Sequence, residues 1–81
     1  MRVTVRLFAR LRDIAGAPEL LRDVPPDATV RSVWQTLVAE YPEFERYEQS
    51  ISAALNANYA RMVNPVCEGD EVAFLPPVSG G

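Results

Sequence analysis

Two glycines, Gly80 and Gly81, close this sequence, and their type and position suit a chemistry carried by the chain end. A carboxylate at the end of a tail without side chains can be activated and used as an acyl donor. Because glycine has no Cβ, such a tail can enter a channel that a larger residue would block. Six extended residues span roughly 20 Å, enough to reach into a partner protein. The two glycines therefore predict a carrier or modifier that works through its C-terminal carboxylate.

The residues before the glycines fit the same purpose. Pro76 and Pro77 fix φ and exclude a helix, so we expect them to lead an extended tail away from the folded body. Val78 and Ser79 follow, directly before the two glycines. The predicted organisation is one folded domain over residues 1–75 and a tail over 76–81.

Side chains that could do chemistry are scarce elsewhere. The chain has no histidine, the residue most often used as general base and metal ligand. Its one cysteine, Cys67, excludes an internal disulfide and a cysteine-only zinc site, and it lies in the apolar stretch 64–67, where we expect a small buried side chain rather than a sulfur-carrying thiol. We therefore expect no metal, no bound cofactor and no catalytic turnover by the chain alone.

Charge and length argue against further classes of function. The chain has 81 residues and a formal net charge of −3, which argues against nucleic-acid binding. All eight basic residues are arginines, which reflects compositional bias or, alternatively, protects an activated terminus from self-acylation by lysine amines. No apolar run is long enough to span a bilayer, and residues 1–6 lack a signal-peptide core. A cytoplasmic protein is expected.

The first part of the chain reads as a wide hairpin. Residues 3–8 alternate with period two, which predicts a half-buried strand, and residues 19–24 predict a second strand. A short helical turn is expected over residues 9–14. Phe8 falls on the mostly polar face of the first strand, where it either covers the sheet edge or lines a partner surface.

One long amphipathic helix should follow. Thr29 is a plausible N-cap, and Tyr41-Pro42 should end the helix, because proline disfavours helical geometry in the residue before it. The apolar positions form one stripe that places Trp34 in the core; they are Val30, Val33, Trp34, Leu37, Val38 and Tyr41.

Shorter elements complete the predicted fold. Residues 42–49 read as a loop with one helical turn, and strands are expected over 51–57, 59–62 and 71–75. In the last strand, Val72 and Phe74 alternate toward the core. This order predicts a two-layer α+β domain, with a mixed sheet of four to five strands on one main helix and an extended C-terminal tail. The helical crossover would allow the first and last strands to lie centrally and parallel, as in the β-grasp (ubiquitin-like) type, and the exact topology rests more on the family resemblance given next.

Three segments resemble one family. Residues 5–12 with Gly16, residues 54–56, and the contiguous stretch Glu68–Gly81 resemble the small, sulfur-carrying subunit of molybdopterin synthase. The resemblance implies that an ATP-dependent adenylyltransferase related to ubiquitin-activating enzymes adenylates Gly81. A sulfurtransferase or cysteine desulfurase then supplies sulfur, which leaves a thiocarboxylate. The family's tail enters the large subunit and donates sulfur to the pterin precursor.

The resemblance also implies roles for individual residues. Gly81 would bear the sulfur, Gly80 would give clearance in the partner's channel, and Val78 and Ser79 would line the inserted segment. Leu75 and Tyr59, with Phe8, would contact the large subunit, and ordinary edge packing is the alternative for these side chains. Arg10 and Arg12 are expected on a solvated surface, with docking of the activating enzyme as the alternative.

Other functions stay open at this point. The same chemistry could serve thiamine, cysteine or tRNA thiolation, or the chain could be a ubiquitin-like protein modifier joined to lysines of its targets. A plain interaction domain without terminal chemistry is a further alternative. For molybdopterin synthase, the family's arrangement implies a heterotetramer built on a large-subunit dimer.

Overall fold

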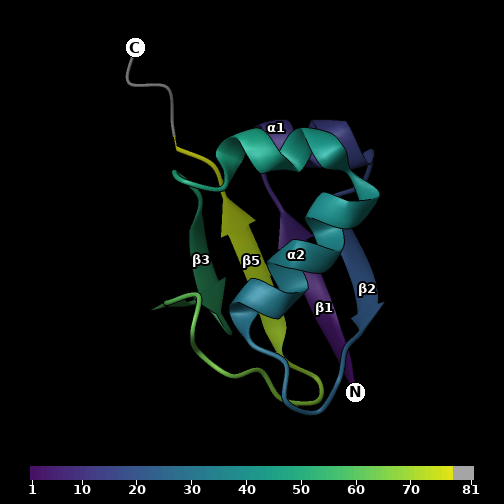
Figure 1. Cartoon of the computed structure of the whole chain (residues 1–81), viewed down its shortest axis with the longest axis vertical. Coiled ribbons are helices and arrows are strands. Elements are labelled where there is room, and N and C mark those ends of the chain that lie inside the picture. Colours follow the sequence, from purple (N-terminus) through teal and green to yellow (C-terminus); the bar gives the residue numbers. More distant parts are fainter. Residues whose placement is uncertain (78–81) are drawn as a thin grey trace.

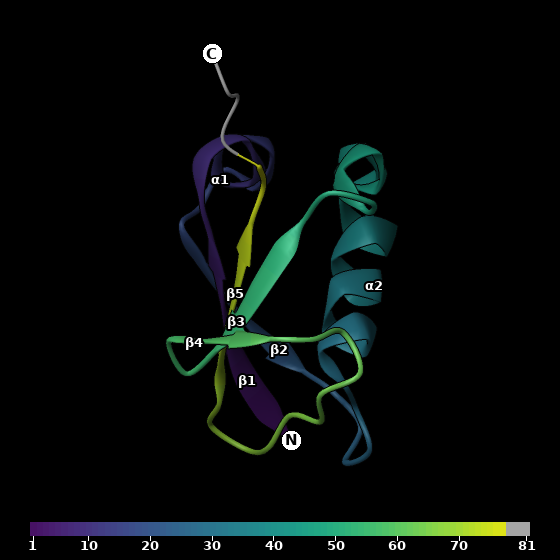
Figure 2. The same ribbon diagram turned by 90° about the vertical axis from the view of Figure 1, so that its left-hand side faces the viewer.

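The computed structural model describes residues 1–77, which form a mixed β-sheet with one long helix across one of its faces (Figure 1). Turned by 90°, the sheet and the helix α2 stand side by side as two layers (Figure 2). The elements are β1 (Arg2–Leu7), α1 (Ala9–Ala15), β2 (Glu19–Asp23), α2 (Val30–Glu40), the 3₁₀ helix η1 (Pro42–Tyr47), β3 (Ser52–Leu55), β4 (Asn58–Ala60) and β5 (Glu71–Leu75).

The sheet has five strands in the order β2-β1-β5-β3-β4. β1 and β5 pair in parallel, and every other neighbouring pair is antiparallel. A parallel pair needs a long crossover, and the segment that contains α2 supplies it. The predicted β-grasp architecture, with its parallel first and last strands, is thus confirmed.

The helix α2 begins at the predicted N-cap. The backbone N–H of Ser32 donates to Oγ1 of Thr29 at 3.2 Å, and the backbone N–H of Thr29 donates to Oγ of Ser32 at 3.1 Å. These reciprocal bonds satisfy donors that the first helical turn would otherwise leave unpaired. The helix ends at Glu40, directly before Tyr41-Pro42, as the proline predicted.

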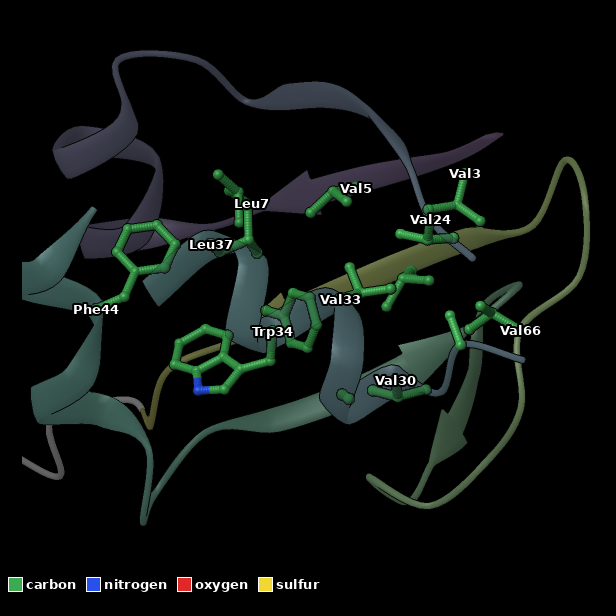
Figure 3. Packing of buried hydrophobic residues seen from close by; sticks show 14 of the residues in the cluster. Val3, Val5, Leu7, Val24, Val30, Val33, Trp34, Leu37, Phe44 and Val66 are labelled. Atoms are coloured by element: carbon green, nitrogen blue, oxygen red, sulfur yellow. The ribbon is translucent and has the colours of Figure 1, made fainter. Parts of the chain in front are cut away.

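The core lies between α2 and the sheet (Figure 3). Val3, Val5 and Leu7 of β1 point toward the helix and are buried, as their alternation predicted. Trp34 lies on the helix side, with its ring centroid 5.5 Å from that of Phe44 and 5.1 Å from that of Phe74. The predicted placement of Trp34 in the core is therefore confirmed.

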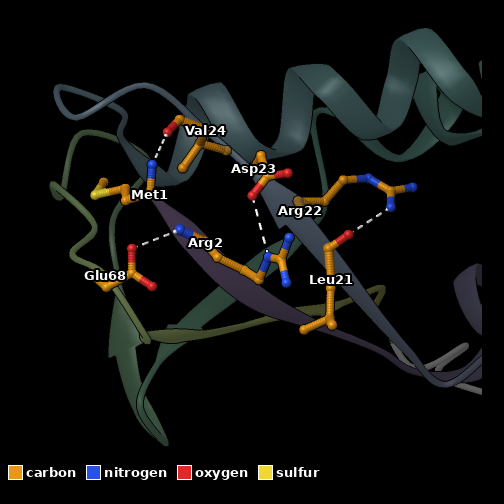
Figure 4. A network of polar contacts seen from close by, with 7 residues as sticks. All are labelled: Met1, Arg2, Leu21, Arg22, Asp23, Val24 and Glu68. Carbon is orange, nitrogen blue, oxygen red and sulfur yellow. Dashed lines mark hydrogen bonds and ion pairs between the residues drawn. The ribbon is translucent and has the colours of Figure 1, made fainter.

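Polar contacts close the open end of the β1–β2 hairpin (Figure 4). The amino group of Met1 donates to the carbonyl of Val24 at 2.8 Å, and Nε of Arg2 contacts Oδ1 of Asp23 at 3.2 Å. Arg22 donates from Nη1 to the carbonyl of Leu21 at 3.0 Å and pairs through Nη2 with Glu40 of α2. Arg22 therefore joins the edge strand β2 to the helix layer.

Several boundaries differ from the sequence prediction. The first strand ends at Leu7 because Phe8 is already the N-cap of α1, which runs one residue beyond the predicted helical turn. The strand predicted over 51–57 is the shorter β3, since Asn56 and Ala57 have positive φ angles of 50° and 72° and form the turn into β4. The strand expected over 59–62 is β4, which begins and ends earlier.

Cys67 is exposed, so the prediction that it is a small buried side chain was wrong. The neighbouring Val66 enters the core in its place. Cys67 opens a turn in which its N–H donates to Oδ2 of Asp70 at 2.7 Å and its carbonyl accepts from the Asp70 N–H at 3.0 Å. This turn directs the backbone outward at Cys67, which an apolar stretch alone does not reveal.

Within residues 1–77, no helix combines the length and apolarity needed to cross a membrane. The last strand ends at Leu75, after which Pro76 is half-buried and Pro77 is exposed. The predicted tail residues Val78, Ser79, Gly80 and Gly81 lie outside the described residues.

Candidate functional site

The sheet face turned away from α2, which we call the outer face, carries the predicted interface side chains. Residues paired directly across neighbouring strands share a face. Arg6 pairs with Ala73, Ala73 with Ala54, and Ala54 with Tyr59. Leu75 pairs with Ser52 on the same face. One row of the outer face therefore runs across four strands from Arg6 to Tyr59.

Phe8 lies at the end of β1 where the tail also leaves the sheet. It follows Leu7, which lies beside Phe74 in the parallel register, so Phe8 and Leu75 belong to the same end and the same side of the sheet. The Phe8 side chain is 37% exposed. The guanidinium carbon of Arg6 lies 5.9 Å from the centroid of the Phe8 ring, within cation–π range.

Leu75 is the final residue of β5 and is half-buried. The inward alternation that the sequence predicted for Val72 and Phe74 is confirmed, because both are fully buried. Leu75 therefore faces outward, directly before Pro76. Its position makes it the side chain of β5 that a partner holding the tail would meet first.

Tyr59 stands on the edge strand β4 and is 91% exposed. Between it and β1 lie only the small side chains of Ala54 and Ala73. Ala54 and Ala73 therefore form a flat apolar surface, with the large side chain of Tyr59 at one end and that of Phe8 near the other. We call Phe8, Leu75, Ala73, Ala54 and Tyr59 together the apolar patch.

Edge packing does not account for Tyr59, because so exposed a ring is hardly covered by this chain. Phe8 and Leu75 are both partly covered, as expected at the end of a sheet. An apolar group at a protein surface gains free energy when a partner removes it from water. The outer face therefore has the composition of a docking surface next to the start of the tail.

A single charged pair crosses the described outer face between its central strands. Nη1 of Arg6 lies 3.7 Å from Oε2 of Glu71. Both side chains are more than 40% exposed, so the pair adds little to stability. Its effect is on orientation, because it holds the Arg6 guanidinium in the middle of the face, within reach of the Phe8 ring.

The turn between β3 and β4 is anchored to the start of β5 through Asn56. Nδ2 of Asn56 donates to Oδ1 of Asp70 at 3.0 Å, and the N–H of Glu71 donates to Oδ1 of Asn56 at 2.9 Å. The backbone N–H of Asn56 also donates to the carbonyl of Glu71 at 2.8 Å. These bonds fix β4, and with it Tyr59, relative to the strand that leads into the tail.

Some exposed apolar residues were missed at the sequence level. Leu21, which lies opposite Thr4 on the outer face, is 56% exposed, and Val63, after β4, is 65% exposed. The sequence Leu20-Leu21 gave no sign of which leucine faces out, because that depends on the register of β2 against β1. Arg10 and Arg12 are exposed on α1.

Residues 1–77 hold no group of three or more His, Cys, Asp or Glu side chains arranged to bind a metal ion. Among the residues that the structure describes, Tyr41 has a displaced pKa, and it lies away from the apolar patch, directly after α2. Hydrogen bonding to Glu40 raises the pKa of Tyr41, with further increases from burial and from the Glu40 charge, while Arg22 opposes them. The described site thus offers contact surface rather than acid–base groups.

Comparison with known proteins is consistent across sequence and structure. The ThiS family model matches residues 5–81. The molybdopterin synthase sulfur carrier subunit of Arabidopsis thaliana is 35% identical over 79 residues, which cover 98% of this chain and 82% of that protein. Small archaeal modifier protein 1 of Haloferax volcanii is 34% identical over 84 residues, covering 94% of this chain and 97% of that protein.

Solved structures share this fold. The crystal structure of SAMP1 from Haloferax volcanii superposes with a TM-score of 0.89 at 34% identity and covers 100% of both chains. A protein–protein complex of subunits 1 and 2 of the molybdopterin-converting factor from Helicobacter pylori contains a chain with the same fold, with a TM-score of 0.70, 23% identity and 100% coverage of both chains. With its sheet order, its single main helix and a family match that reaches residue 81, the chain belongs to the ThiS family of sulfur carriers.

Proposed function

We propose that this chain is the sulfur carrier subunit of a molybdopterin synthase and that its sulfur is borne by Gly81. The observation that carries the proposal is the apolar patch beside the end of β5, where the chain continues into Pro76 and Pro77. The family match that extends to residue 81 and the name of the Arabidopsis thaliana relative support it.

The proposed chemistry takes place at the C-terminal carboxylate in partner active sites. The carboxylate attacks the α-phosphorus of ATP on an adenylyltransferase, and pyrophosphate leaves. The terminal sulfur of a persulfide on a sulfurtransferase or cysteine desulfurase then attacks the acyl carbon, and AMP leaves. A second thiol cleaves the resulting acyl disulfide, which releases the thiocarboxylate and leaves a disulfide on the sulfur donor. In the large subunit, the thiocarboxylate sulfur attacks a carbon of the pterin precursor, from which an oxygen substituent leaves. Hydrolysis of the resulting thioester keeps the sulfur on the pterin and restores the carboxylate.

The described residues would serve this chemistry by binding and aiming. Phe8, Leu75 and Tyr59 would contact the large subunit, while Pro76 and Pro77 restrict the directions open to the tail. Val78, Ser79 and Gly80 would occupy the channel, and the absence of a Cβ at Gly80 and Gly81 would let the acyl carbon approach the reacting centre. Two carriers on a large-subunit dimer would make a heterotetramer.

The test is reconstitution from purified components. The chain ending at Gly81 is incubated with ATP, the adenylyltransferase and a sulfur donor, and mass spectrometry follows the exchange of one oxygen for sulfur. The thiocarboxylated chain is then mixed with the large subunit and the pterin precursor. We expect the dithiolene product, and its absence after complete thiocarboxylation would overturn the choice of pathway. Gly81→Ala should slow activation or transfer, since its methyl group would crowd the channel.

Surface variants test the docking surface separately. Leu75→Glu should weaken binding to the large subunit by about tenfold or more, because it places a charge in a patch that becomes dry on binding. Val63→Glu is the control, because it introduces the same charge at an apolar residue outside the apolar patch, and it should leave the affinity within about twofold. Equal losses for both variants would contradict the proposed docking surface.

A second candidate function is protein modification, which the likeness to small archaeal modifier protein 1 favours. In that case, the activated Gly81 would be joined to a lysine amine of a target. Incubation of the activated chain with a lysate of its own cells, followed by a search for lysines that carry residues 62–81, the segment that trypsin leaves after Arg61, distinguishes the two uses. Adducts in the absence of any dithiolene synthesis would favour the modifier.

A further inference from the structure

The junction between β1 and α1 breaks two local rules at consecutive residues. Phe8 is the N-cap of α1 but makes no side-chain cap hydrogen bond, in a position that usually holds Ser, Thr, Asp or Asn. Ala9 has a φ of 52°, in the left-handed region that glycine adopts most easily. When neighbouring residues both oppose the local preference of the chain, a function is the usual reason.

At the other end of the same helix, the left-handed position is held by glycine, as is usual. The C-cap of α1 is Gly16, with a φ of 77° and its N–H donating to the carbonyl of Arg12 at 2.9 Å. Open space surrounds the position where a Cβ would stand on Gly16, so glycine is used there for its backbone alone. The chain therefore places glycine at one left-handed position of α1 and alanine at the other.

The backbone on both sides of Phe8 is fixed. On one side, the buried Leu7 donates its N–H to the carbonyl of Pro18 at 2.9 Å. On the other, the carbonyl of Phe8 accepts the N–H of Leu11 at 3.1 Å, and the fully buried Leu11 anchors α1 in the core. The direction in which the Cα–Cβ bond of Phe8 leaves the chain thus depends on the few backbone torsions at Phe8 and Ala9, and χ1 then directs the ring. A Cβ at residue 9 restricts those torsions, whereas glycine would leave them freer.

We propose that Ala9 is a positioning residue whose left-handed backbone holds the Phe8 ring in one direction on the outer face, between Arg6 and the end of β5. An aromatic ring held in its bound direction loses less conformational entropy when a partner covers it. The consequence for partner binding rests on the proposed function, whereas the ring's fixed direction is a property of this chain alone.

The ring's direction can be measured without any partner. The chain has three phenylalanines, and Phe44 and Phe74 are fully buried, so fluorophenylalanine labelling should give one exposed resonance, assigned to Phe8 by its loss in Phe8→Leu. In Ala9→Gly, we expect that resonance alone to move toward the position of free fluorophenylalanine. Ala9→Asn, which keeps a Cβ and tolerates the left-handed region, should retain the original resonance. An unmoved Phe8 resonance in Ala9→Gly would overturn the proposal.

Binding supplies the second readout. Ala9→Gly should weaken affinity for the large subunit by about threefold to tenfold, and Ala9→Asn should restore it. In a Phe8→Ala background, Ala9→Gly should have no further effect, because the ring it positions is gone. Gly16→Ala strains the opposite end of α1 and serves as the control, with a lower melting temperature but unchanged affinity.

The two readouts separate the two hypotheses. A parent chain that does not bind the large subunit refutes the proposed function, and the Phe8 resonance alone then decides the role of Ala9. A parent chain that binds, combined with an Ala9→Gly variant of equal affinity, refutes the positioning role while the proposed function stands.

Discussion

The ring centroids of Trp34 and Phe74 lie 5.1 Å apart, with the ring planes tilted by 53°. This contact joins the middle of α2 to the second-last residue of β5, directly before the outward-facing Leu75. Nε1 of Trp34 is buried and finds no hydrogen-bond acceptor within residues 1–77. The same side chain thus makes the largest contribution to the core and leaves a buried donor unpaired there.

Two replacements of Trp34 should therefore separate the effect of its volume on stability from the effect of its unpaired N–H. Trp34→Ala should lower the free energy of unfolding by about 3–5 kcal/mol, because it leaves a large cavity beneath β5. Trp34→Phe also removes volume, but it removes the unpaired N–H as well, whose burial costs about 1–3 kcal/mol. We expect Trp34→Phe to lie within about 1 kcal/mol of the parent.

Urea unfolding followed by circular dichroism measures both variants, since Trp34 is the chain's only tryptophan and its fluorescence is lost with it. Leu21→Ala is the control for an apolar side chain that is mostly exposed, and its cost should be about 0.5 kcal/mol or less. If Trp34→Phe proves as damaging as Trp34→Ala, the unpaired indole N–H has no energetic role.

The turn between β3 and β4 offers a second pair of variants. Asn56→Gly keeps the positive φ accessible but removes the side-chain bonds to Asp70 and Glu71, so we expect a loss of about 1–2 kcal/mol. Ala57→Gly loses no hydrogen bond and relieves a φ of 72°, so its stability should be equal to or greater than that of the parent. The changes in stability of the two variants, measured by thermal and urea unfolding, should differ in sign or clearly in size. Equal losses of stability would argue against Asn56 as the anchor.

Tyr41 should make the stability of the folded protein depend on pH in the alkaline range. Its pKa is higher in the folded protein than the ordinary 10.0, chiefly through hydrogen bonding to Glu40. The folded state therefore holds the phenol proton more tightly than the unfolded state. The resulting stability is complete below the ordinary pKa and is lost as the pH rises through the folded-state pKa.

Tyr41→Phe should therefore be less sensitive than the parent to pH above about 10. The measurement is the urea midpoint between neutral pH and the alkaline range for the parent, Tyr41→Phe and the control Tyr47→Phe. We expect the decline of the midpoint to flatten in Tyr41→Phe and to persist in Tyr47→Phe. Parallel declines in all three proteins would show that Tyr41 does not contribute.

Elements with a regular pattern could be predicted closely from the sequence. The alternation of Val3, Val5 and Leu7 identified the buried face of β1, and Thr29 and Pro42 marked the limits of α2. Each of these signals is local, because it depends on side chains within one element. The single long helix allowed the parallel pairing of β1 with β5, but the exact topology rested more on the family resemblance than on any local signal.

Features that depend on pairing register or turn geometry could not be predicted in the same way. Cys67 is exposed because of a turn held by Asp70, and the short β3 results from the positive φ angles at Asn56 and Ala57. The apolar patch brings Phe8 together with residues more than 45 positions away. That Ala54 and Ala73 belong to this patch therefore follows only from the strand order. The predicted roles of Gly80 and Gly81 stay predictions.

The strand order also separates the sheet into two hairpins, β1–β2 and β3–β4, which share no ladder with each other. β5 lies between them and supplies every hydrogen-bonded ladder that joins one hairpin to the other. Each hairpin can form early from neighbouring segments, whereas β5 must close long loops to reach both β1 and β3. Without β5, no ladder joins the two hairpins, so the sheet is complete only when the strand that leads to the tail has taken its place.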